Sequence, residues 1–166
     1  MRVRGLLLPL LLLACTACTV PVDGRAVPEP DPARPVATVP RPALVADVLD
    51  DECLLDGAGF ARLLGTPVAP PVTDGRPRSC AASGLGGAVL ATINVYAVRE
   101  GVPTDLVRSG RRLDGVGDAA AVVDTVSGPT LQVAAGDVLV TIAVADRAPS
   151  DARWVEAGRA AVAALP

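Results

Sequence analysis

Seven prolines between positions 21 and 42 limit most strongly what this chain folds into. They stand at positions 21, 28, 30, 32, 35, 40 and 42, with acidic and arginine residues between them. Proline lacks a backbone N–H and fixes φ, so a segment this rich in proline favours an extended polyproline conformation over a helix or a central strand. We therefore interpret residues 18–42 as a Pro-rich tether and residues 43–166 as the folded domain.

The residues before the tether have the pattern of an export signal. Arg2 and Arg4 precede an apolar run from Leu6 to Ala14 that is too short to cross a bilayer as a helix. The run ends at Cys15 and Cys18, where a plain signal peptide would have a cleavage site between small residues. This predicts a lipoprotein signal peptide within residues 1–17, cleaved after 14 or 17 residues, with a secreted protein that has incidental cysteines as the alternative.

Two cysteines compete for the lipid. Cys15 follows Leu12-Leu13-Ala14, which has the expected leucine three positions upstream, whereas Cys18 follows the smaller Thr16-Ala17. We predict lipidation at Cys15, with Cys18 as the alternative. A cysteine that carries two acyl chains anchors a protein stably in a membrane. We therefore expect this protein to be held on the cell membrane, facing the extracytoplasmic side.

Residues 43–166 predict an α+β domain built on an antiparallel sheet of about five strands. A hairpin over 79–83 and 88–98 turns at Gly84–Gly87, and a three-strand meander covers 119–126, 130–134 and 138–145. Short helices are expected from Asp56 to Gly65 and over 103–112, and a C-terminal helix from Ser150 or Asp151 to about Leu165. Residues 43–49 are expected to be a helical turn or an irregular lead-in, and residues 67–77 an irregular crossing.

The apolar pattern of the sequence also predicts three features of the packing. The strand at 88–98 is largely apolar on both faces, so we expect it to be central and covered on both sides. Phe60 and Trp154 fall on apolar helix stripes and are expected in the core, whereas Tyr96 is ambiguous. Gly158 falls on the stripe of the C-terminal helix, where it would let the sheet approach the helix backbone closely.

The opening of the folded domain resembles a family. Asp51-Glu52-Cys53-Leu54-Leu55, a short helix ending Leu63-Leu64-Gly65, and then Ser79-Cys80 resemble the first part of the actinobacterial lipoproteins called domain of unknown function 3558. Members of that family open with a DPC-LL segment, a helix ending in LLG and a second cysteine. Two departures stand out: Glu52 replaces the usual proline, and Ala81-Ala82 replace a frequent aromatic residue.

The resemblance continues to the end of the chain. Gly115-Val116-Gly117-Asp118-Ala119 resembles the GLGD-A turn of the family, and a hairpin and a terminal helix follow it. The similarity covers about Leu49 to Pro166, together with the lipoprotein leader. It implies the fold and topology of that family and no known activity.

Cys53 and Cys80 are the two cysteines of the folded domain. Because an exported protein meets an oxidising environment, we predict a structural disulfide between them. A redox-active pair and two unpaired thiols are the alternatives, but redox pairs usually have the C-x-x-C spacing, and here 26 residues intervene.

Three charged or glycine-rich clusters are weaker candidates. Asp50-Asp51-Glu52 with Asp56 offers oxygen ligands for Ca²⁺, or is a solvated turn with Asp56 as a helix cap. Arg108, Arg111 and Arg112 would meet anionic lipid or cell-wall phosphate, or simply end a helix in solvent. The glycines at 115 and 117 are interpreted as turn residues rather than a phosphate loop.

The basic residues exclude several kinds of chemistry. All fifteen are arginine, and the chain has neither lysine nor histidine, so it lacks the usual base of Ser/His and Cys/His pairs and the lysine of a Schiff base. The net charge of −3 argues against nucleic acid as a partner. We assign no catalytic, cofactor-binding or metal-binding residue.

These observations favour a lipid-anchored, non-enzymatic binding module of unknown biochemical activity. Its expected partners are the membrane, through the anchor, and an envelope protein, a glycan or an apolar ligand. A carboxylate-based envelope hydrolase and a purely structural envelope component are the alternatives. A hydrolase needs two carboxyl groups that converge roughly 5–10 Å apart, whereas a binder of apolar ligands needs a concave pocket lined by Val, Leu and Ala.

Overall fold

The computed structural model describes residues 43–166, which form eight strands and three helices. In chain order these are β1 (Leu44–Val45), α1 (Gly57–Leu64), β2 (Val72–Asp74), β3 (Ser79–Ser83), β4 (Val89–Val98), α2 (Pro103–Leu106), β5 (Arg111–Arg112), β6 (Ala119–Thr125), β7 (Gly128–Ala135), β8 (Val138–Val144) and α3 (Asp151–Ala163). The predicted α+β class is confirmed. The predicted signal peptide, Cys15, Cys18 and the tether lie outside the described residues.

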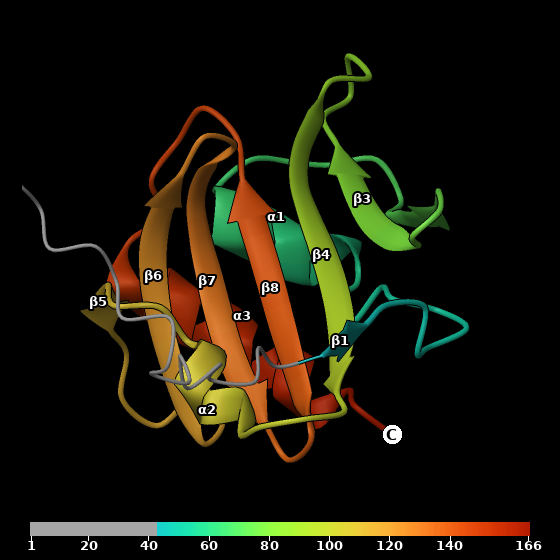
Figure 1. Cartoon of the computed structure of the whole chain (residues 1–166). Helices are drawn as coiled ribbons and strands as arrows, with labels where there is room; N and C mark the ends of the chain where they lie inside the picture. The colour runs from blue at the N-terminus through green and yellow to red at the C-terminus, as the bar shows by residue number, and fades with distance from the viewer. Residues whose placement is uncertain (1–42) are drawn as a thin grey trace, which may run out of the picture. The chain divides into compact units, whose positions relative to one another are not determined.

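The strands form one antiparallel sheet in the order β2-β3-β4-β8-β7-β6-β5 (Figure 1). β1 lies off this path. β3 and β1 pair with the same edge of β4: β3 with the first part of β4, and β1 with its last residues. The register pairs Cys80 with Ile93 and Val45 with Ala97, so residues 94–96 of this edge lie between the two partner strands. This interruption of the sheet is central to the site described below.

The sheet has more strands than the five predicted. The additional strands β1, β2 and β5 have only two or three residues each, which is too short for an alternating pattern to be visible in the sequence. β1 and β2 lie in the segments 43–49 and 67–77, which we had expected to be irregular or helical. Their strand geometry comes from pairing with β4 and β3 rather than from local preference.

The helix predicted over residues 103–112 is wrong in its second half. Pro103 does begin α2, but the helix ends at Leu106. Arg111 and Arg112 instead pair with Val122 and Ala121 of β6, so strand pairing replaces the last helical turns.

Helices α1 and α3 cover one face of the sheet (Figure 1). Asp56 begins α1, and its Oδ1 accepts a hydrogen bond from the N–H of Gly59 at 2.7 Å. The core between helices and sheet includes Phe60, Leu63 and Trp154, all at most 1% exposed, as expected for the two aromatic residues. Arg62 of α1 forms a salt bridge of 2.7 Å with Glu156 of α3 on the outer side of this layer.

Gly158 lets α3 approach the sheet closely, as its position in the sequence predicted. A Cβ atom built there would lie 2.6 Å from Cγ1 of Val116 and 3.2 Å from Cδ2 of Leu131. Ser150 is the N-cap residue, and the helix ends at Ala163, slightly earlier than expected.

The opposite face of the sheet is only partly covered. In β4, Ile93 and Val95 face the helices and are fully buried, whereas Asn94 and Tyr96 on the other face are half-buried. The short helix α2 lies on this second face and contacts β7 and β8 (Figure 1). The expectation that β4 is covered on both sides is therefore wrong, because Asn94 and Tyr96 remain partly exposed on this face.

Candidate functional site

The segment from residue 43 to residue 53 borders the sheet and is held at several points. β1 pairs with the end of β4, and the N–H of Arg99 donates to the carbonyl of Ala43 at 2.9 Å. The guanidinium group of Arg78 contacts the main-chain oxygens of Asp47 and Asp50, each at 3.3 Å, and lies 3.6 Å and 3.4 Å from their carboxylates. The segment ends at Cys53, which forms a disulfide with Cys80 of β3.

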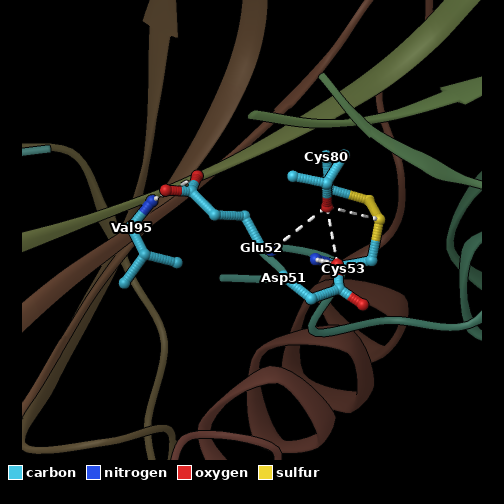
Figure 2. Close-up of a disulfide and its surroundings, with 6 residues drawn as sticks. Asp51, Glu52, Cys53, Cys80 and Val95 are labelled. Carbon is cyan, nitrogen blue, oxygen red and sulfur yellow. Dashed lines mark hydrogen bonds between the residues drawn. A yellow bond between two sulfur atoms is a disulfide. The ribbon is translucent and has the colours of Figure 1, made fainter. Parts of the chain in front are cut away.

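Glu52 occupies the interruption in the sheet between β3 and β1. Its side chain is fully buried, and Oε2 accepts a hydrogen bond from the N–H of Val95 at 3.3 Å (Figure 2). That N–H points to the sheet edge where no strand stands opposite residues 94–96 within the described chain. The carboxyl group therefore supplies the acceptor that a neighbouring strand would otherwise provide.

The other oxygen of Glu52 is in an unusual position. Oε1 is buried and has no hydrogen-bond partner among residues 43–166. Burial raises the pKa of the Glu52 carboxyl above its ordinary value, and the hydrogen bond from Val95 offsets only part of this effect.

Asp51, the neighbouring residue, is in the opposite electrostatic situation. Its exposed carboxylate accepts hydrogen bonds from the hydroxyl of Thr73 at 2.6 Å and from the N–H of Cys53 at 2.8 Å. These two donors hold the pKa of the Asp51 carboxyl below its usual value. The same hydroxyl oxygen of Thr73 accepts the N–H of Glu52 at 3.1 Å, so one side chain of β2 fixes both acidic residues.

A groove lies beside this segment, at the end of the sheet where the β7–β8 turn is found. It has a volume of about 560 Å³. Its apolar lining consists of Val45, Ala46, Val48, Leu49, Ala97, Ala135, Val138 and Leu165. Asp47, Arg99 and Asp137 add charged groups to the lining. Gly136 and Pro166 complete the lining of this concave site.

The acidic cluster predicted around residues 50–56 is not brought together. Asp50 is held by Arg78, Asp51 by Thr73 and Cys53, Glu52 is buried against Val95, and Asp56 caps α1. Within the part of the chain that the structure describes, no three acidic, Cys or His side chains are grouped so as to hold a metal ion.

The three arginines of the second cluster do not share a single cleft: Arg108 and Arg111 line one, and Arg108 and Arg112 another. Arg111 forms a salt bridge with Asp151 at the start of α3. Arg108 and Arg112 line a separate cleft of about 450 Å³, together with Asp114 and Asp118. This cleft is therefore lined by residues of both charges.

The glycine turn that borders this cleft has the geometry expected of a turn. Gly115 and Gly117 both adopt positive φ, at 69° and 55°. The carbonyl of Gly115 accepts a hydrogen bond from Nε of Arg159 at 2.8 Å.

Sequence reasoning missed the groove and the role of Glu52. The groove brings together residues near positions 47, 97, 137 and 165, and no local pattern links positions so far apart. The one signal for Glu52 in the sequence was that it replaces the proline that is usual at this position in the family that the chain resembles. Proline has neither the N–H that Glu52 donates to Thr73 nor a carboxyl group that could lie beside Val95.

None of the helices within residues 43–166 has the length and apolar character needed to cross a membrane. Comparisons of this chain with protein-family models, with curated proteins and with solved structures find no match.

Proposed function

We propose that this chain is a lipid-anchored protein of the cell envelope, similar to the actinobacterial lipoproteins of domain of unknown function 3558, whose extracytoplasmic domain acts by binding. Its ligand is the hydrocarbon part of an amphiphile, bound in the groove beside residues 45–49. The observation that carries this proposal is the apolar lining of that groove.

The size and chemistry of the groove support the proposal. Ligand sites in proteins commonly measure about 300–1,000 Å³ and have mostly apolar walls with a few polar groups. The groove of about 560 Å³ is lined by nine residues with apolar side chains and three with charged ones, so it suits an apolar chain that carries a polar end. Four of its residues, Val48, Leu49, Val138 and Leu165, also pack against the hydrophobic core.

The position of the groove also fits a ligand found at a membrane. Its first lining residue, Val45, follows shortly after the segment 18–42 that we interpret as the tether. A lipid anchor at Cys15 or Cys18 would keep the domain within reach of amphiphiles from the same membrane.

Binding of an uncharged apolar dye tests the proposal. The chain carrying Cys15→Ala and Cys18→Ala, which has no acyl chain of its own to compete, should increase the fluorescence of Nile red, and 1-decanol should displace the dye. Leu165→Asp and Val48→Asp place a charge in the groove and should weaken dye binding by about tenfold or more, because burying an unpaired charge is costly.

Leu85→Asp is the matched control, because Leu85 is 79% exposed and lies outside the groove. It makes the same chemical change and should leave dye binding as it was. Equal binding by all variants, each with a cooperative thermal transition, would contradict the groove as the binding site.

A further inference from the structure

The wall of the groove and the carboxyl of Glu52 belong to one short stretch of chain. Residues 45–49 line the groove, and Glu52 follows three residues later, with the disulfide at Cys53 immediately beyond it. Between β1 and Cys53, the stretch is held by Arg78 at Asp47 and Asp50 and by the Glu52 side chain beside Val95. The N–H of Glu52 also donates to Thr73, and Val48 and Leu49 pack against the hydrophobic core. Among the ionisable side chains of this stretch, the carboxyl of Glu52 is buried, whereas the contacts of Arg78 are at the surface.

The contact of Glu52 with the sheet depends on its charge. A neutral carboxylic acid fits a buried position with a single N–H donor far better than a carboxylate does, since an ionised group without further donors loses its hydration. Here one oxygen has a long hydrogen bond of 3.3 Å and the other has none among residues 43–166. The ionised form therefore gains by leaving the sheet for solvent.

The charged groups around Glu52 do not remove this preference. Asp47 disfavours the ionised form, and Arg78 favours it, but that guanidinium group is shared with Asp47 and Asp50. Asp51 is a further acidic neighbour, and Tyr96 on β4 is affected by the charge of Glu52.

We propose that Glu52 is a proton-operated latch for the wall of the groove: the neutral carboxyl seats residues 44–52 against β4 and keeps the groove formed, and ionisation releases them. This inference rests on the proposed function, because it concerns the regulation of the same groove. The expected consequence is that the groove binds its ligand in acidic surroundings and loses it as the pH rises.

The latch is tested first without any ligand, by hydrogen exchange of the full chain carrying Cys15→Ala and Cys18→Ala. After correction for the intrinsic pH dependence of exchange, the amides of Val95, which donates to Glu52, and of Arg99, which donates to Ala43, should lose protection between about pH 4.5 and about pH 8.5. This range spans ordinary and strongly raised carboxyl pKa values. Glu52→Gln mimics the neutral acid and should keep their protection throughout. Glu100→Gln is the matched control, because this exposed residue lies outside the groove and should behave as the parent chain does.

Nile red binding over the same pH range then connects the latch to the groove. As the pH rises, the form with Glu52 seated in the sheet becomes a minor population, so the affinity of the parent chain for the dye should fall by about tenfold. The affinity of Glu52→Gln should stay constant. Unchanged protection and unchanged affinity in the parent chain would overturn the latch. If amide protection depends on pH as expected but the dye does not bind at any pH, the proposed function is overturned and the latch remains. The two failures are therefore distinguishable.

Discussion

Asp51 and Glu52 are neighbours in the chain, and their carboxyl groups have opposite charge preferences. The exposed Asp51 carboxylate has two hydrogen-bond donors, so its pKa is lowered, and the buried Glu52 carboxyl has one long hydrogen bond, so its pKa is raised. The segment that contains both is consequently most stable over an interval of pH in which Asp51 is ionised and Glu52 is neutral.

Glu52→Gln should increase the free energy of unfolding at neutral pH. A carboxyl with a raised pKa stabilises the fold fully below its unfolded value near 4.5 and loses that contribution as the pH rises through its folded value. The variant avoids the buried charge, so we expect a gain of about 1–3 kcal/mol at neutral pH and little difference in acid. Urea unfolding at a series of pH values measures this, and an equal change at every pH would contradict it.

Asp51→Asn should have the opposite pH dependence. A carboxylate with a lowered pKa stabilises the fold above its unfolded value near 3.8 and loses that contribution as the pH falls through its folded value. Because the side chain is exposed, the loss at neutral pH should be below about 1 kcal/mol. The difference between the variant and the parent chain should therefore shrink as the pH falls below 3.8; a difference that does not shrink would argue against an electrostatic origin.

The Cys53–Cys80 disulfide should be fully formed in exported protein. Mass spectrometry after alkylation without reduction should find both residues unmodified, and native material with both alkylated would contradict the assignment. Replacing both cysteines by serine should lower the free energy of unfolding by about 2–5 kcal/mol, because the bond restricts the unfolded chain.

Gly158→Val should destabilise the packing of α3 against the sheet. The added Cβ meets Val116 at 2.6 Å, and overpacking of this kind costs about 1–3 kcal/mol. Ala160→Val is the control, because Ala160 is exposed on the same helix and loses only helix propensity, below about 1 kcal/mol. Thermal unfolding of the two variants should separate these effects, and equal melting temperatures would count against close packing at Gly158.

The lipid anchor is tested in cells. Metabolic labelling with an alkyne palmitate should mark the protein, and the double change Cys15→Ala, Cys18→Ala should abolish the label. Retention of the label in the double variant would show that neither cysteine carries the lipid, and the two single variants decide between them.

The larger elements could be predicted from the sequence because their signals are local. The apolar runs and intervening turn residues over 119–145 and the capping of α1 by Asp56 depend on neighbours in the chain, and the structure has the three strands and the cap. The strands β1, β2 and β5 depend instead on distant partners, which a pattern of two or three residues does not reveal.

The site was harder to predict than the fold, for the same physical reason. Glu52 lies in a run of acidic residues, which is typical of a solvated turn, and its burial is decided by the interruption between β3 and β1. The two cysteines could be paired from the sequence because an oxidising environment and a count of two leave few arrangements.

The order of contacts along residues 44–53 also determines how the domain bears a mechanical load. A pull on the chain from its N-terminal side first meets β1, whose two residues are held only by strand pairing, and then the surface contacts of Arg78. If these yield, residues 44–52 extend by at most roughly 30 Å. The pull then reaches Cys53, where a covalent bond passes the force to β3. While that bond is intact, the chain between Cys53 and Cys80, which includes α1 and β2, bears none of the tension.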